Sequence, residues 1–194
     1  MKLLTILGSV KKRILLILGI VFFVGAGIQW YYWSHTRVAA HGSSGLIVDF
    51  DDARDTKDIL DLFEANWHWL VASPDYSPAY MLKNRSPHEN PLYHGKLTLK
   101  VLREKNVFVG FIAYYKKKPQ EGFILFVAVK EHFRGKRYAE KLMDYAMDDL
   151  KAQGARSVWL ITRLSNLRAQ ALYKRLGFYE LQHDEEFIYF QRDL

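Results

Sequence analysis

The fold is decided by the stretch Phe123–Gly154, FILFVAVKEHFRGKRYAEKLMDYAMDDLKAQG. Its first seven residues, 123–129, are apolar and rich in β-branched and aromatic side chains, which predicts a buried strand. The later part places apolar residues on one stripe with a helical period, at Ala139, Leu142, Met143, Ala146, Met147 and Leu150. Gly154 stands where a helix commonly ends in a left-handed residue. The stretch therefore predicts a strand, a turn and an α-helix.

The turn between this strand and helix has the sequence RGKRYA at residues 134–139. The first turn of a helix leaves several backbone N–H groups unpaired, and the helix dipole makes that end partly positive. Such a turn can hold phosphate groups, and Lys and Arg side chains strengthen the attraction. The same residues also fit an ordinary solvated loop, so the turn by itself leaves both interpretations open.

A second stretch, NLRAQALYKRLGF at residues 166–178, gives the turn its context. Together the two stretches resemble the GNAT superfamily of acetyl-CoA-dependent N-acetyltransferases. The phosphate-loop pattern of that family, Gln/Arg-x-x-Gly-x-Gly/Ala, is matched at Arg134 and Ala139, but Arg137 stands where the family usually has its first glycine. The later pattern, Asn-x-x-Ala-x-x-Leu-Tyr-x-x-x-Gly-Phe, is met in full by Asn166, Ala169, Leu172, Tyr173, Gly177 and Phe178. The resemblance covers roughly residue 45 to the C-terminus.

The resemblance implies where acetyl-CoA, the acyl donor, would bind. Its pantetheine arm is expected to pair with the backbone of Val127, Ala128 and Val129, with the Val127 N–H bonding the acetyl carbonyl. The pyrophosphate is expected on the loop headed by Arg134, through the N–H groups of Gly135, Lys136, Arg137, Tyr138 and Ala139. Arg137 is expected to serve there if its φ is negative. Asn166 is expected to be a helix cap, a cofactor ligand, or both.

The resemblance also assigns a catalytic acid to the second stretch. Tyr173 is expected to protonate the departing thiolate, because a phenol with a pKa near 10 keeps its proton at neutral pH. Helical spacing alone would make Tyr173 a core aromatic residue. For the general base, many relatives have a Glu at the position of Phe123, and Glu121 lies on the same face of an extended strand. His183, Asp184, Glu185 and a water chain are the alternatives.

Composition limits the chemistry further. The 194-residue chain has no cysteine, which excludes disulfides, thiolate metal sites and a cysteine nucleophile. The net charge of +7 is concentrated in the first forty residues, and residues 41–194 carry a net charge of only +2. The globular part therefore gives no case for binding nucleic acid. His88 and His94 are spaced too loosely to indicate a metal site.

The N-terminal part predicts a different organisation: a basic terminus at 1–13, a transmembrane anchor at 14–33, a linker at 34–44 and the acetyltransferase domain at 45–194. Residues 14–33 are twenty uncharged residues, enough to span about 30 Å of hydrocarbon. The alternative is a secreted protein cleaved after Ala40. The basic flank predicts a domain outside the cytoplasm. Acetyl-CoA is a cytoplasmic metabolite, so the expected side stays uncertain, with a weak preference for a single-pass protein facing the cytoplasm.

The rest of the chain completes a β-α-β-β-β-α-β-α-β-β order. Strands are expected at 46–50, 97–101, 107–115, 123–129, 157–162, 178–181 and 187–190. The helix carrying Ile59, Leu60, Phe63, Trp67 and Leu70 is expected to begin at Asp55 or Thr56. Residues 73–91 contain four prolines, which exclude one long helix and leave a binding loop or a surface excursion.

The predicted fold is thus α/β (α+β), a GNAT-like mixed and mostly antiparallel sheet flanked by helices, preceded by one transmembrane helix. The predicted function is a membrane-anchored N-acetyltransferase that moves an acetyl group from acetyl-CoA directly to an amine. The alternative is a catalytically silent acyl-CoA-binding sensor. A small polyamine, an antibiotic, a peptide N-terminus and a lysine all stay open as acceptors, and so does a homodimer.

Overall fold

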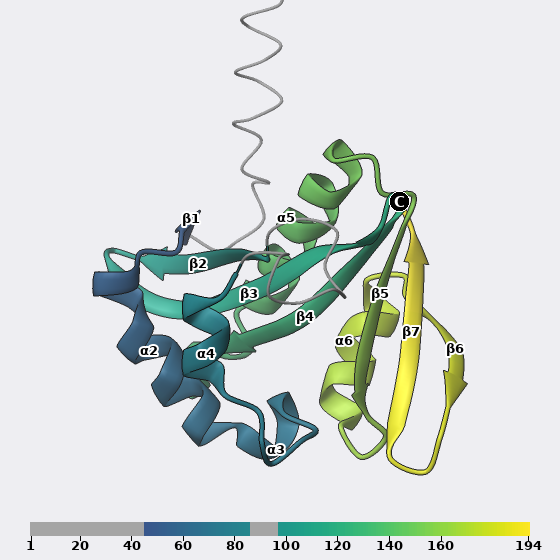
Figure 1. Ribbon diagram of the computed structural model, residues 1–194, viewed down its shortest axis with the longest axis horizontal. Helices are drawn as coiled ribbons and strands as arrows, with labels where there is room; N and C mark the ends of the chain where they lie inside the picture. The colour runs from purple at the N-terminus through teal and green to yellow at the C-terminus, as the bar shows by residue number, and fades with distance from the viewer. Residues whose placement is uncertain (1–44, 86–96) are drawn as a thin grey trace, which may run out of the picture. The chain divides into compact units, whose positions relative to one another are not determined.

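The sheet has seven strands within the residues that the computed structural model describes, 45–85 and 97–194, in the order β1-β2-β3-β4-β5-β7-β6 (Figure 1). The strands are β1 (Leu46–Asp49), β2 (Thr98–Glu104), β3 (Val107–Lys118), β4 (Glu121–Val129), β5 (Ser157–Arg163), β6 (Tyr179–His183) and β7 (Phe187–Asp193). Neighbours run antiparallel except β4 and β5, which are parallel. The predicted mixed, mostly antiparallel sheet is confirmed.

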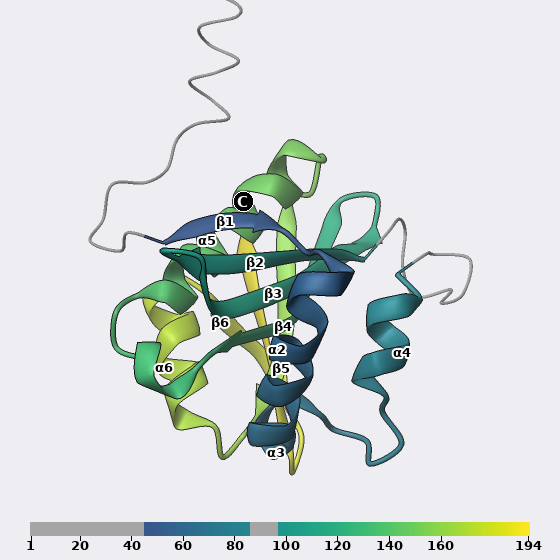
Figure 2. The same ribbon diagram turned by 90° about the vertical axis from the view of Figure 1, so that its left-hand side faces the viewer.

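Helices cover both faces of this sheet (Figure 2). The helices are α2 (Asp52–Ala65), α3 (Trp67–Leu70), α4 (Pro78–Lys83), a 3₁₀ turn η1 (Glu131–Phe133), α5 (Tyr138–Ala152) and α6 (Leu167–Arg175). The apolar residues of α2 and α4 pack on one face of the sheet, and those of α5 and α6 pack on the other. The core is therefore two apolar layers with the sheet between them.

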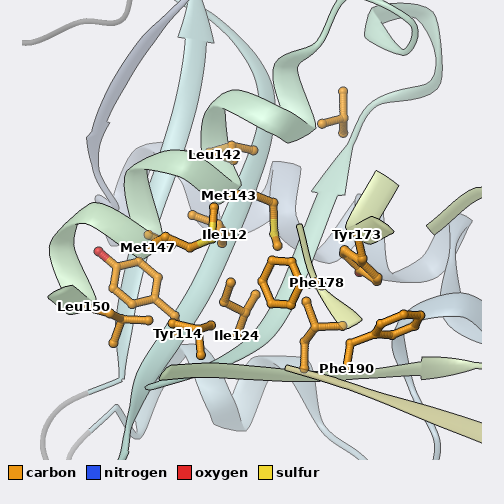
Figure 3. Packing of buried hydrophobic residues seen from close by; sticks show 14 of the residues in the cluster. Ile112, Tyr114, Ile124, Leu142, Met143, Met147, Leu150, Tyr173, Phe178 and Phe190 are labelled. Carbon is orange, nitrogen blue, oxygen red and sulfur yellow. The ribbon is translucent and has the colours of Figure 1, made fainter. Parts of the chain in front are cut away.

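The predicted stripe of α5 forms one of these layers. Leu142, Met143, Met147 and Leu150 are buried against β3 and β4 residues such as Ile112 (Figure 3). The approach of the helix is close, because a Cβ at Gly122 of β4 would lie 2.7 Å from Leu150 Cδ1. Gly154 has a φ of +88° just past the helix, as predicted.

The start and end of α2 differ from the sequence prediction. Asp51 caps the helix by accepting a hydrogen bond from the Arg54 N–H at 2.8 Å, so neither Asp55 nor Thr56 is the cap. Asp55 instead lies fully buried within the first turn, bonded to Arg54 and Arg103. The helix ends at Ala65 because Asn66 leaves the helical conformation, with a φ of −131°.

The proline-rich stretch contains one short helix. Ser77 caps α4 by accepting from the Tyr80 N–H at 3.1 Å, and Pro78 occupies the first helical position, where its missing N–H does no harm. This agrees with the exclusion of one long helix. Residues 86–96, which include His88 and His94, lie outside the described residues.

Strand β4 contains the irregularity that shapes the rest of the molecule. Ile124 pairs with Tyr114 and Phe126 pairs with Ala113, so Leu125 has no partner on β3. This β-bulge puts Leu125 and Phe126 on the same side of the sheet and bends the strand. The parallel pairing with β5 is limited to Glu121–Phe123 against Ser157–Trp159. Beyond it β4 and β5 diverge (Figure 1).

The first forty-four residues are not described, so the predicted segments 1–13, 14–33 and 34–44 lie outside this account. Among residues 45–85 and 97–194, none of the helices has the length and apolar character needed to cross a membrane.

Candidate active site

A cleft of about 600 Å³ opens where β4 and β5 diverge. One wall is β4 from Leu125 to Val129, and the other consists of the end of β5 and the first turns of α6. The N-terminus of α5 lines it with Arg137, Tyr138, Ala139 and Glu140, and α2–α3 line it with Asn66, Trp69 and Leu70. The cleft thus brings together segments that lie far apart in the sequence.

The edge of β4 inside the cleft has no strand beside it. Pairing with β5 stops at Phe123, so the backbone of Val127 and Ala128 borders the cleft on that side. An extended ligand can add to such an edge as an extra strand. The backbone of Val129 is already partly engaged, because its carbonyl accepts a hydrogen bond from Arg134 Nε at 3.0 Å. The predicted pairing of the pantetheine arm with Val127 stays a prediction.

The predicted phosphate loop forms a tight turn into α5. Gly135 has a φ of +81°, and a Cβ there would meet nothing within 4 Å, so glycine serves the backbone conformation and not space. Arg137 has a φ of +60°, so the condition of a negative φ, under which Arg137 was expected to serve in the loop, is not met. The left-handed conformation explains why a glycine is usual at this position. The Arg137 side chain lies at the surface, with its Nε 3.7 Å from Glu140 Oε2.

The other loop side chains have separate roles. Arg134 donates to Asn66 Oδ1 at 2.6 Å, and burial, followed by the charge of Arg168, lowers its pKa. Tyr138 is buried, and its hydroxyl donates to Glu104 at 2.6 Å, away from the loop. Lys136 does not line the cleft; its Nζ lies 5.4 Å from the centre of the Phe133 ring.

Two arginines of α6 were missed by the sequence reasoning. Arg168 and Arg175 both line the cleft, and Arg175 is 3.2 Å from Glu140 of α5. Their i, i+7 spacing places both on one face of α6, and this signal was visible in the sequence. With Arg137 they make this end of the cleft basic, which suits a phosphate-bearing ligand.

Tyr173 combines the two roles that the sequence left open. It is a buried core residue, with its ring centre 6.0 Å from that of Phe178 and 5.8 Å from that of Phe190 (Figure 3). It also lines the cleft. Burial raises the pKa of its phenol to about 12, and no group within the described residues is hydrogen-bonded to its hydroxyl. The phenol therefore keeps its proton at neutral pH and has it free to donate.

Asn166 acts as a helix cap. Its Oδ1 accepts a hydrogen bond from the Ala169 N–H at 3.2 Å at the start of α6. It also lines the cleft, so a second role toward a ligand stays a prediction.

None of the four side chains named as candidate bases lines the cleft. Glu121 is at the closed end of the β4–β5 pair, 3.2 Å from Lys118. The cleft begins at Leu125, the unpaired residue of the bulge, so sharing a strand face with Phe123 does not bring Glu121 into it. Asp184 accepts from the backbone N–H groups of residues 186 and 187 in the β6–β7 turn, and His183 contacts Glu180. Glu185 is in the same turn and does not line the cleft either.

A family model described as "Acetyltransferase (GNAT) family" matches residues 57–178 of the chain. A [ribosomal protein bS18]-alanine N-acetyltransferase from Haemophilus ducreyi is 32% identical over 85 residues, which are 44% of this chain and 57% of that protein. The chain spans between 38% and 57% of the length of the curated relatives that it matches.

Solved structures share the fold. Ard1 from Thermoplasma volcanium superposes with a TM-score of 0.63 and 24% identity, covering 78% of this chain and 99% of that one. The PaiA N-acetyltransferase from Thermoplasma acidophilum, in complex with coenzyme A, has a TM-score of 0.61 and 15% identity, covering 78% of this chain and 100% of that one. Both proteins are thus matched over nearly their whole length by about four fifths of this chain.

The prediction of a single-pass membrane protein is corrected. The helices of residues 45–85 and 97–194 include none that could span a membrane. The prediction of a membrane anchor rested on the uncharged run at residues 14–33, which lies outside the described residues.

Three observations point to the same family. The family model matches more than half of the chain, strands β4 and β5 diverge after three paired residues, and a tight turn leads into α5. This chain belongs to the Acetyltransferase (GNAT) family, whose members are the acetyl-CoA-dependent acyltransferases that its sequence predicted.

Proposed function

We propose that this protein transfers the acetyl group of acetyl-CoA directly to a free α-amine, such as the N-terminus of a peptide or protein. One observation carries the proposal: a single cleft joins the open edge of β4, the basic loop at α5 and the proton-bearing Tyr173. Relatives named as N-terminal acetyltransferases, among them "N-alpha-acetyltransferase 30" of Schizosaccharomyces pombe, support this acceptor class.

The donor is expected to lie along the β4 edge with its phosphates at the start of α5. The first backbone N–H groups of α5 have no hydrogen-bond partner within the helix. Arg137, Arg168 and Arg175 add positive charge there. This arrangement leaves the thioester on the β4 side, toward Tyr173. Binding then fixes the reacting carbonyl in place, which supplies much of the catalytic effect of such sites.

The chemical step needs two proton movements. The amine nitrogen forms a bond to the acetyl carbon while the carbon–sulfur bond breaks. The departing thiolate takes a proton from the Tyr173 hydroxyl, and the new amide nitrogen loses its extra proton to water. The phenol is then reprotonated from solvent. The chain has no cysteine, which excludes a cysteine-linked acyl enzyme and supports the direct transfer that we propose.

The acceptor class follows from the scarcity of carboxylates. Glu140 is the sole Asp or Glu that lines the cleft in the described parts of the chain, and it is occupied by Arg137 and Arg175. An acceptor that needs little help to lose its proton is therefore favoured. About a third of α-amines are neutral near pH 7.5, against roughly one in a thousand lysine side chains.

The test compares two peptides with the purified full chain. One has a free N-terminus and no lysine; the other has a blocked N-terminus and one internal lysine. We expect CoA release with the first and at least about 100-fold slower release with the second at pH 7.5. The kcat/KM for the first peptide should rise up to about pH 8 and then level off, as its own amine deprotonates.

Equal rates for the two peptides would contradict the α-amine assignment. Binding of acetyl-CoA without CoA release for any amine would contradict the enzymatic proposal and favour the silent sensor.

A further inference from the structure

The short helix α3 lies at the open end of the V formed by β4 and β5 (Figure 1). Two arginines hold the α2–α3 segment there. Arg134 follows β4 and donates to the Asn66 side chain, and Arg163 is the last residue of β5. Arg163 Nε donates to the His68 carbonyl at 2.6 Å, and its second amino group donates to the Val71 carbonyl at 3.1 Å. One bond to the α2–α3 segment thus comes from the loop that follows β4, and the others come from the end of β5.

Arg163 makes further contacts with the last hairpin. Its remaining amino group pairs with Glu186, and its guanidinium lies 5.2 Å from the centre of the Phe187 ring. The Arg163 side chain is only 13% exposed, and its bond to the Val71 carbonyl is partly buried. The rigid, planar fork of an arginine can satisfy three such directions at once, which a lysine ammonium on a flexible stem cannot do in the same way.

The helix that Arg163 holds contributes apolar surface to the cleft. Trp69 and Leu70 line it from α3, and Ile161 lines it from β5. Trp69 is 47% exposed and Ile161 is 41% exposed, although both are large apolar side chains. These residues contrast with the arginines around the start of α5. The apolar wall suits the side chains that follow an acceptor amine and not the phosphates of the donor.

We propose that Arg163 is a positioning residue for the acceptor: it fixes α3 so that Trp69 and Leu70 form the wall against which the first residues of the acceptor pack. This inference rests on the proposed function. Arg163 does not line the cleft, so its effect would pass through the His68 and Val71 carbonyls of the segment that it holds. Acceptor binding should depend on it, and donor binding should not.

The test uses Arg163→Lys and Arg163→Gln in the full chain, with the peptide of free N-terminus as acceptor. Losing these charge-assisted bonds should raise the KM for the peptide by about tenfold or more. The kcat should stay within about threefold and the Kd for acetyl-CoA within about twofold, because Tyr173 and the α5 loop are untouched. Hydrogen exchange of residues 66–71 should become roughly tenfold faster.

Glu186→Gln is the matched control. It removes the ion pair of Arg163 with the last hairpin and leaves both carbonyls of the α3 segment bonded. We expect the peptide KM and the exchange of residues 66–71 to match the wild type. Arg163→Lys keeps the charge and guards against loss of folding in Arg163→Gln.

Equal losses in peptide KM and acetyl-CoA affinity for Arg163→Lys would overturn the proposal, as would a Glu186→Gln variant with the same KM defect. A wild-type chain that turns over no amine would refute the proposed function. Unchanged exchange of residues 66–71 in Arg163→Lys would refute the positioning role whether or not turnover is found, so the two failures are distinguishable.

Discussion

Arg137 shows how a single residue can depart from a family pattern without loss of the local fold. Its backbone has a φ of +60°, a conformation that an L-residue with a side chain adopts at an energetic cost. The Arg137 side chain is 71% exposed, so it extends into solvent and does not disturb the packing of the core. The loop therefore keeps its shape, and having arginine in place of the usual glycine lowers the stability of the fold locally.

Replacing Arg137 by glycine should remove the energetic cost of the left-handed conformation. We expect the free energy of unfolding to rise by about 0.5–1 kcal/mol, since the left-handed penalty exceeds the entropy that glycine loses on folding. Acetyl-CoA affinity should stay the same or increase, because glycine suits the left-handed loop and Arg168 and Arg175 still supply positive charge at this end of the cleft. Urea unfolding and calorimetric titration would measure the two quantities.

Lys136→Gly is the control, because Lys136 is not among the residues with positive φ. That variant should be destabilised by about 0.5–1 kcal/mol. A destabilised Arg137→Gly variant would show that the guanidinium contributes more than its backbone conformation costs.

For single residues, the sequence predicted which motif positions lie at the cleft better than it predicted their backbone conformation. Ala139, Asn166 and Tyr173 all line the cleft, and their roles toward acetyl-CoA stay predictions. The φ of Arg137 was not readable, because it depends on how the loop meets α5. Glu121 lies outside the cleft because β4 and β5 pair side by side up to Phe123, and the cleft opens only from Leu125. Where this pairing stops could not be read from the sequence.

Packing between elements is illustrated by Tyr114 of β3 and Asp149 of α5. The Tyr114 side chain is fully buried (Figure 3). Its hydroxyl donates to Asp149 Oδ2 at 2.6 Å. Burial, and then the hydrogen bond to Asp149, raise the pKa of Tyr114 well above its ordinary value. The contact thus joins the helix to the sheet only while the phenol keeps its proton.

Alkaline pH should therefore weaken the fold. The folded-state pKa values of Tyr114 and Tyr173 both lie above the unfolded value near 10, so the stabilisation is complete below pH 10 and is lost as pH rises above it. The free energy of unfolding should fall by up to about 1.4 kcal/mol per pH unit for each tyrosine.

Urea unfolding at several pH values between 9 and 11.5 would measure this slope. Tyr114→Phe should fall less steeply than the wild type, since one of the two protons is gone. Identical slopes would show that Tyr114 does not retain its proton in the folded state.

Among elements, the sequence was most informative where an apolar period was long. The stripe of α5 and its end at Gly154 followed from fifteen residues with one regular period. Residues 59–70 share a helical spacing too, but Asn66 interrupts it, bonding Leu62 O through its amide while Arg134 takes its oxygen. That partner comes from a loop 68 residues away, so local periodicity could not reveal the break.

For the whole molecule, the divergence of β4 and β5 produces the cleft. The two strands pair over only three residues each, and the N-termini of α5 and α6 then lie on the opening between them. The sequence predicted both strands and both helices. It could not predict the divergence, because that depends on where pairing stops and not on which residues form strands.

The central claim is that this cleft transfers acetyl groups with Tyr173 as the proton donor. Tyr173→Phe keeps the ring contacts with Phe178 and Phe190 and removes only a hydroxyl that has no partner among the described residues. The most direct test is therefore single-variant kinetics with acetyl-CoA and the peptide of free N-terminus. We predict that kcat and kcat/KM fall together by about 10²–10⁴-fold while the Kd for acetyl-CoA and the melting temperature stay unchanged. Turnover equal to that of the wild type in a normally folded Tyr173→Phe protein would contradict the account.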